Sequence, residues 1–333
     1  MTMKQPYSLF GRVIVRQRPI WVKVSVSLLL LLLPFGIAYL SGITSDIFIN
    51  GQWRFLLLAP SIIIYIWLLS PFTDRQSKEV VRSLQAISTL DEESFSTLIE
   101  KAQQINPRNE WIAIATGVIL GLAINSVDDL GGTDTLFQVY WTLSSVAMYT
   151  MMVWIVYIST ASSRLGEALL RQPLRINIFN PAPFEAIGRQ SLLLAMAFVG
   201  GITLSLVLTF QVANLTEPLF WLIYLPLVLV TLLIFFLGVR PAHRLLAKQK
   251  DRELWGVQSH LERLGQELMV RMDKQEETST IASEINALAI YEQRLQGART
   301  WPYNTGMLRT LFFSVLMPLG PVLIKIVIDI VME

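Results

Sequence analysis

Two opposite charges near the C-terminus, Lys325 and Asp329, stand one helical turn apart in an otherwise apolar run. They extend a stripe of polar and proline residues whose steps of three or four positions place every member on one helical face. The members of this stripe are Thr310, Ser314, Pro318, Pro321, Lys325 and Asp329. A polar face within a membrane span is typical of a water-filled path or of a contact between packed helices. The stripe is therefore the first candidate functional surface, as a pore or a gated interface.

Gln138, Thr142, Ser145 and Tyr149 form a second polar face with helical spacing. Both faces have a structural alternative, because hydrogen bonds between side chains hold membrane helices together. Lys325 and Asp329 also have a structural alternative. Charged residues near a membrane surface anchor the end of a helix, and a lysine there can snorkel. The sequence leaves both interpretations open.

The chain lacks the residue patterns of known catalytic and metal sites. It has no cysteine, and its two histidines, His243 and His260, lack the spacing of a zinc-binding helix. It also lacks a phosphate-binding glycine loop and a nucleophile elbow. Asp128, Asp129 and Asp134 are expected to be solvated loop carboxylates rather than ligands of a hard cation. We expect no enzyme activity, no cofactor and no bound metal.

Composition places the chain in the membrane class. Of 333 residues, 53% are hydrophobic and 16% are charged. Apolar runs of about 20 residues are long enough to cross a bilayer as helices. Seven runs qualify: Trp21–Ile43, Trp53–Phe72, Trp111–Val127, Leu136–Thr160, Ser191–Val212, Leu219–Val239 and Leu308–Ile328. We predict an all-α, polytopic integral membrane protein with seven transmembrane helices and a helical cytoplasmic subdomain.

The distribution of positive charge predicts the orientation. If the N-terminus is cytoplasmic, all of the 27 lysines and arginines except Arg54 and Lys325 fall on the cytoplasmic side, as the positive-inside rule requires. Seven spans then place the C-terminus outside. The predicted location is the cell (inner, cytoplasmic) membrane, where the lipid bilayer surrounds the spans.

Two long segments fall on the cytoplasmic side. Residues 73–110 carry an apolar stripe and then a capping box, Thr89 to Glu92, which opens a second helix that ends at Pro107. Residues 243–298 carry a heptad seam with one polar break, which predicts a helical hairpin. We expect the hairpin to fold against the first segment, and the alternative is a seam that joins two protomers. Neither segment has a basic block, so nucleic acid is not an expected partner.

The third cytoplasmic segment, residues 161–190, contains three prolines that prevent one continuous helix. We expect an elbow at the membrane interface, with Phe179 and Phe184 on the membrane surface.

The predicted organisation of the chain has five parts. They are residues 1–72 with spans one and two, residues 73–110 as a cytoplasmic helical segment, residues 111–240 with spans three to six and the elbow, residues 241–305 as the hairpin, and residues 306–333 with the last span.

The stretch GARTWPYNTGMLRTLFFSVLMPL resembles uncharacterised bacterial polytopic membrane proteins in which a Trp-Pro-aromatic-Asn/Asp-Thr element precedes the last span. In this chain the element begins at Trp301 and Pro302. The resemblance implies a multi-pass membrane protein and brings no known activity with it. In physical terms, Trp301 and Pro302 predict a rigid turn just before the last helix.

These features predict a homo-oligomeric, channel-like or transport-related protein whose last helix lines the functional surface, because several copies of one polar helix around an axis form a path. The alternative is a membrane scaffold or signalling protein that presents its cytoplasmic helices to a soluble protein partner. A ring-shaped oligomer would favour the first function, and a stoichiometric partner would favour the second.

Overall fold

The computed structural model describes residues 19–44, 48, 53–103, 106–125, 135–209, 218–316 and 320. Its helices are, in chain order, α2 (Ile20–Leu40), α4 (Trp53–Leu56), α5 (Leu58–Gln85), α6 (Glu92–Gln103), α7 (Pro107–Asn125), α8 (Thr135–Leu170), α9 (Ala182–Thr209), α10 (Pro218–Asp273), α11 (Ser279–Gly297) and α12 (Thr305–Leu316). These described ranges contain no β-strand. The predicted all-α class is confirmed.

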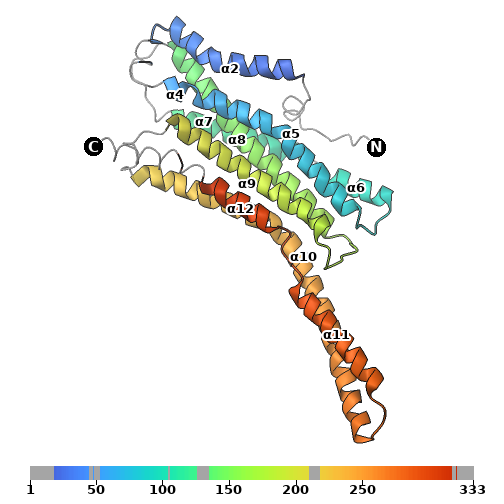
Figure 1. Cartoon of the computed structure of the whole chain (residues 1–333). Helices are drawn as coiled ribbons and strands as arrows, with labels where there is room; N and C mark the ends of the chain where they lie inside the picture. The colour runs from blue at the N-terminus through green and yellow to red at the C-terminus, as the bar shows by residue number, and fades with distance from the viewer. Residues whose placement is uncertain are drawn as a thin grey trace, which may run out of the picture.

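Five of the described helices are long and apolar enough to cross a membrane: α2, α4 with α5, α8, α9 and α10. Helices α5, α8, α9 and α10 lie side by side as a bundle (Figure 1). Helix α2 contacts them mainly near its C-terminal end, where Pro34 and Ala38 are buried. Many large apolar side chains face outward on these helices, as hydrocarbon surroundings allow. The protein has the architecture of an all-α membrane protein, and the count of seven spans stays a prediction.

Two glycines bring α7 into direct contact with the backbone of α8. A Cβ added at Gly117 would collide with the Cα of Thr150, and one added at Gly121 would lie 2.6 Å from the Cα of Val146. Small residues four positions apart are the pattern that lets membrane helices approach closely. Helix α7 covers most of the third predicted run, Trp111–Val127, and begins one turn earlier.

A third glycine makes room between α5 and α9. The hydroxyl of Tyr65 occupies the space that a Cβ on Gly200 would need, and it donates a 2.9 Å hydrogen bond to the carbonyl oxygen of Ala197. Close packing at this glycine agrees with the sequence, which has Gly200 and Gly201 in succession. The apolar side chains of α5 also share a core with α8, made of Ala59, Ile62, Ile66, Met148 and Met151.

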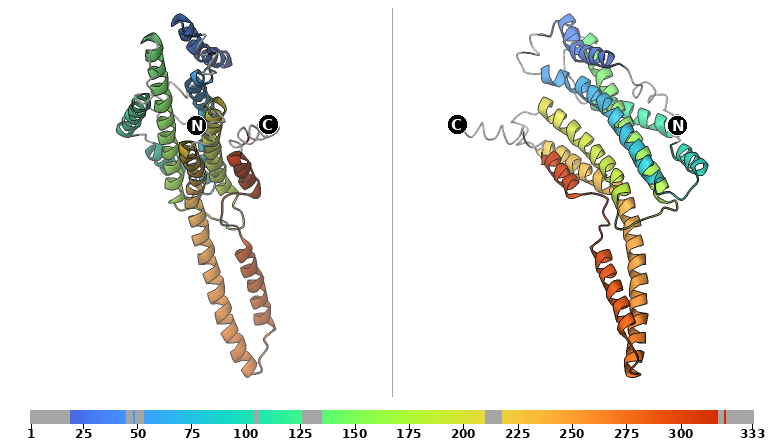
Figure 2. Two further views of the ribbon diagram at one scale, coloured as in Figure 1. Left: turned by 90° about the vertical axis from the view of Figure 1, so that its left-hand side faces the viewer. Right: turned by 45° about the vertical axis from the view of Figure 1, so that its right-hand side comes forward.

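Helix α10 runs beyond the bundle and pairs there with α11 to form a hairpin. It has 56 residues, including Pro226 and Pro241, and it bends between the part on α9 and the part paired with α11 (Figure 1). A proline bends a helix because it lacks an N–H and clashes with the preceding turn. Pro241 follows directly after the apolar half of α10. Both views in Figure 2 show the hairpin projecting from one end of the bundle, which we call the hairpin end.

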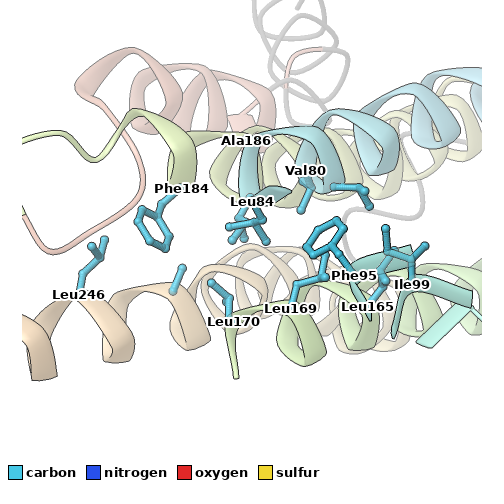
Figure 3. Close-up of a cluster of buried hydrophobic side chains, with 13 residues drawn as sticks. Val80, Leu84, Phe95, Ile99, Leu165, Leu169, Leu170, Phe184, Ala186 and Leu246 are labelled. Atoms are coloured by element: carbon cyan, nitrogen blue, oxygen red, sulfur yellow. The ribbon is translucent and has the colours of Figure 1, made fainter. Parts of the chain in front are cut away.

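The prediction that the hairpin folds against residues 73–110 is wrong. The two arms of the hairpin cover each other, with Val257 and Leu295 buried between them. The apolar stripe of residues 73–110 packs instead on the end of α8 and the start of α9 (Figure 3). Of the described hairpin residues, those at its base join that cluster: Ala242 and Leu246 are buried in it, and Leu245 packs against it. Each stripe is thus covered by these neighbours and not by the other stripe.

Two local predictions around α6 are also wrong. Asp91 caps the helix in place of Thr89, because the Ser94 N–H donates a 3.1 Å hydrogen bond to the Asp91 carboxylate. Hydrogen bonds from the Ser94 side chain and backbone lower the pKa of this carboxyl. Thr89 donates its N–H and its hydroxyl to the Pro173 carbonyl oxygen. Pro107 does not end α6 but opens α7, where the missing N–H of a proline is not needed.

Replacing Gly117 or Gly121 by alanine should destabilise the protein, because the added methyl group meets backbone atoms of α8 that cannot rotate away. We expect each substitution to cost about 1–3 kcal/mol and to lower the melting temperature of the detergent-solubilised protein. Gly36→Ala in α2 is the control, since nothing lies within 4 Å of a Cβ at Gly36. Equal melting temperatures for the three variants would contradict the close packing of α7 on α8.

Candidate functional site at the base of the hairpin

The elbow between α8 and α9, residues 171–181, lies against the turn that joins α5 to α6. Ser88 and Leu174 form an antiparallel bridge, and the Arg175 N–H donates a 2.8 Å hydrogen bond to the Ile87 carbonyl oxygen. Backbone groups outside helices need hydrogen-bond partners when they are shielded from water. The two loops satisfy each other's groups, so the elbow is held in one position.

A cluster of apolar side chains lies under this bridge and brings five of the described helices together (Figure 3). Its buried members are Val80, Val81, Leu84, Phe95, Ile99, Leu165, Leu169, Leu170, Phe184, Ala186, Ile187, Ala242 and Leu246. Phe184 is almost completely buried in it, so the prediction that Phe184 rests on the membrane surface is wrong. The physical reason is its place in the first turn of α9, whose inward face is apolar.

The other side of the elbow supports the hairpin. Ile178, which is 2% exposed, is buried against Leu295 of α11. Phe179 packs edge-on against Tyr291 with ring centroids 5.7 Å apart, and the Arg294 guanidinium carbon lies 5.6 Å from the Phe179 centroid. Cations are attracted to aromatic faces in this way. Phe179 therefore contacts the hairpin, and because it is still 44% exposed, its place on the membrane surface stays a prediction.

The segment that returns from α11 to α12, residues 298–304, is fastened to α10. The His243 ring stacks on Trp301 with centroids 3.7 Å apart and planes at 3°, and its Nδ1 lies 3.3 Å from the Thr300 carbonyl oxygen. Lys250 donates hydrogen bonds of 2.6 and 3.1 Å to two carbonyl oxygens at the end of α11. A cation suits this place because the last carbonyl groups of a helix have no partners within the helix.

The same segment is fastened to α9 and α12. Pro302 is buried, and its carbonyl oxygen fills the space that a Cβ on Gly188 would occupy. Asn304 accepts a 2.8 Å hydrogen bond from the Met307 N–H and so caps α12. The turn predicted from the Trp-Pro pair thus lies where three helices meet. Its small neighbour Gly188 was not recognised from the sequence, because nothing local marks it as a contact.

Charged and polar side chains connect α5 to α9 at the hairpin end. Arg189 lies 2.6 Å from a carboxylate oxygen of Glu79 and 3.8 Å from one of Glu185, and Gln190 donates a 3.1 Å hydrogen bond to Ser77. The paired groups are partly exposed, so each ion pair contributes on the order of 1 kcal/mol or less. Their value lies in fixing the register of α9 on α5.

A buried carboxylate was missed from the sequence. Glu110, in the first turn of α7, is 6% exposed and accepts a 3.2 Å hydrogen bond from the indole N–H of Trp154. The N-terminal end of a helix favours a negative charge, which offsets part of the cost of burial. The sequence does carry a local signal for this residue, because Glu110 stands three positions after Pro107, where a helix begins. The sequence does not show that α8 covers it.

The first predicted polar face lies only in part within the described residues. Thr310 is exposed, and the Ser314 hydroxyl donates a 2.7 Å hydrogen bond to the Thr310 carbonyl oxygen within α12. The other four members, Pro318, Pro321, Lys325 and Asp329, lie outside the described residues, as do Asp128, Asp129 and Asp134.

The second predicted polar face lies along α8. Gln138 is exposed, Thr142 and Tyr149 are half-buried, and Ser145 is buried. Helix α8 packs on α5 and α7, whereas α12 packs on α9 and on α10. The described members of the first face, Thr310 and Ser314, therefore lie on a helix that packs on other neighbours than α8 does.

Ile178→Ala should loosen the hairpin at its base, because Leu295 and its neighbours lose the side chain that fills the contact. We expect a cost of about 2–5 kcal/mol for a buried isoleucine, measured as faster amide hydrogen exchange in α11 and in the paired part of α10. Arg175→Ala is the control in the same elbow, since that side chain is exposed. Unchanged exchange in the hairpin of Ile178→Ala would contradict the contact.

The contacts at the hairpin base are apolar, stacking and capping contacts. Among the described residues, no three His, Asp or Glu side chains come together as metal ligands. The arrangement holds α11 and residues 298–304 against α9, α10 and α12, so the described contacts fix the position of the hairpin. Comparisons of the chain with family models, curated proteins and solved structures found no match.

Proposed function

We propose that the protein is a membrane scaffold or signalling protein that presents the α10–α11 hairpin to a soluble protein partner. The observation that carries this proposal is apolar surface on an element that projects away from the bundle. Its exposed apolar side chains are Trp255, Met269, Val270, Met272 and Ile290, of which Trp255 is 73% and Met269 66% exposed. Such residues in water are typical of protein interaction sites.

The tip of the hairpin is the strongest part of this surface. Met269, Val270 and Met272 are all more than half exposed, and they lie within the last turn and a half of α10. Methionine adapts to partners of different shape because its side chain is unbranched and polarisable. The soluble partner we infer therefore has an apolar groove that accepts the tip.

The proposal places the hairpin end in the cytoplasm of the cell, with seven spans and the C-terminus outside. The support is the charge distribution, because residues 73–110, 161–190 and 240–309, whose described parts lie toward the hairpin end, hold most of the lysines and arginines of the chain. A cytoplasmic hairpin tip is reached by soluble proteins without crossing the bilayer. Its joint with α9 and α12 would pass a movement of the hairpin to the membrane helices, which is the property that a signalling protein needs.

Capture of the full-length protein from cross-linked membranes should yield a stoichiometric soluble partner. The triple variant Met269→Ser, Val270→Ser and Met272→Ser should lose most of that partner at an unchanged melting temperature, because exposed side chains contribute little to folding. The control variant Asn286→Ser with Gln293→Ser changes exposed polar residues of α11 and should retain the partner. Equal capture by both variants, or no stoichiometric partner at all, contradicts the proposal.

A second candidate, a homo-oligomeric channel lined by the last helix, is favoured by one observation. Thr310 is exposed, while Met307 and Leu311 of the same helix are buried against the bundle. The polar face therefore starts on the side of α12 that is turned away from its own protomer. A second copy of the chain on that side would make Thr310 part of an interface or a pore.

Single cysteines test the channel in this chain, which has no natural cysteine. If the face lines a path, water-soluble thiol reagents should modify Ser314→Cys, Pro321→Cys and Lys325→Cys in intact membranes. Phe312→Cys, at an exposed apolar position of α12, should stay unmodified. If none of the three polar-face variants reacts, the channel function is wrong.

A further inference from the structure

One exposed face of α10 changes from apolar to basic where the helix leaves the bundle. Its members, at steps of three or four positions, are Leu229, Leu233, Leu237, Arg240, Arg244 and Lys248. All six are exposed. A face of this kind follows one helix from the hydrocarbon of a membrane to its surface.

The basic side chains of this part of α10 fall into two groups. His243 and Lys250 are engaged with the segment that returns from α11. Arg240, Arg244 and Lys248 point to the exposed side, and none of them takes part in the ion pairs of the described residues. Helix α10 has no acidic residue before Asp251. Three cations thus have no ion-pair partner among the described residues, and they lie next to an apolar face.

We propose that Arg240, Arg244 and Lys248 bind the phosphate groups of anionic phospholipids in the leaflet at the hairpin end. The acyl chains of such a lipid would lie along the apolar part of the same face, which is why a lipid is the ligand that fits, rather than a soluble polyanion. The three residues span about 12 Å of helix, and their long side chains reach the headgroup layer by snorkelling. Arginine suits phosphate because its planar fork donates two hydrogen bonds at once.

The lipid site does not depend on the proposed soluble partner. A lipid bound there would fix the position of α10 near its bend, because it would hold the helix at the level where it leaves the membrane. Juxtamembrane cations near anionic lipid each strengthen binding about fivefold. The lipid composition would therefore influence the angle at which the hairpin projects.

The test uses the full-length protein in detergent micelles, titrated with phosphatidylglycerol or with phosphatidylcholine, and reads the melting temperature. Phosphatidylglycerol should raise the melting temperature of the wild type, and phosphatidylcholine should not. Arg240→Gln, Arg244→Gln and Lys248→Gln together should shift the half-saturating phosphatidylglycerol fraction about a hundredfold. The control variant Arg263→Gln, Arg271→Gln and Lys274→Gln removes the same charge near the hairpin tip and should respond as the wild type does.

Several results would overturn the site. The first is an equal response of the two triple variants to phosphatidylglycerol. The second is equal protection of the wild type by inorganic phosphate or by a soluble acidic peptide, which would show a site for soluble anions instead. If the triple variant at positions 240, 244 and 248 does not fold, the single variant Arg244→Gln decides. A lipid site predicts a shift of about fivefold in its half-saturating phosphatidylglycerol fraction, and the absence of a shift would refute the site.

Discussion

The backbone between α8 and α9 cannot be helical, and its polar groups must find partners elsewhere in the protein. Pro173 and Pro181 impose this constraint, because each lacks an N–H and interrupts a helix, whereas Pro183 stands in the first turn of α9, where the missing N–H is not needed. The chain meets it by pairing the elbow with the turn between α5 and α6. That pairing fixes α5 and α6 relative to α8 and α9. The apolar side chains of these helices then pack together beneath it as one buried cluster (Figure 3). The hairpin then rests on the same elbow through Ile178.

The bundle and the hairpin both expose apolar side chains, but the physical meaning differs. On α2, α8 and the first half of α10, which are long and apolar enough to cross a membrane, the exposed apolar side chains suit the hydrocarbon of a bilayer. The hairpin projects away from these helices (Figure 2), and its heptad seam is already covered by its own two arms. In the part of the chain that the structure describes, no other element covers the apolar side chains at its tip. This difference is why the proposed function rests on the hairpin.

The elements that depend on periodicity and length were predictable from the sequence. Apolar runs of membrane length and the heptad spacing of residues 243–298 each define an element without knowledge of its neighbours. The partner of an apolar stripe is not encoded in the stripe itself, which is why residues 73–110 were assigned to the wrong surface. The cap of α6 failed for a local reason, because Thr89 and Asp91 are both good cap residues two positions apart. Phe179, Phe184 and Glu110 could not be placed, since their surroundings come from segments distant in the sequence.

The projection of the hairpin away from residues 73–110 is the claim on which the proposed function depends most directly. A distance between spin labels at Ser96→Cys on α6 and Glu276→Cys at the hairpin tip tests it, because both positions are exposed and the chain has no other cysteine. The stretch of α10 from Leu246 to Asp273 is about 40 Å long, and Leu246 shares a cluster with α6. The account predicts a label separation of about 40 Å or more. A hairpin folded back on α6 would bring the labels to about 20 Å, which is a helix-packing distance plus the label arms. A dominant separation of that size would contradict the account.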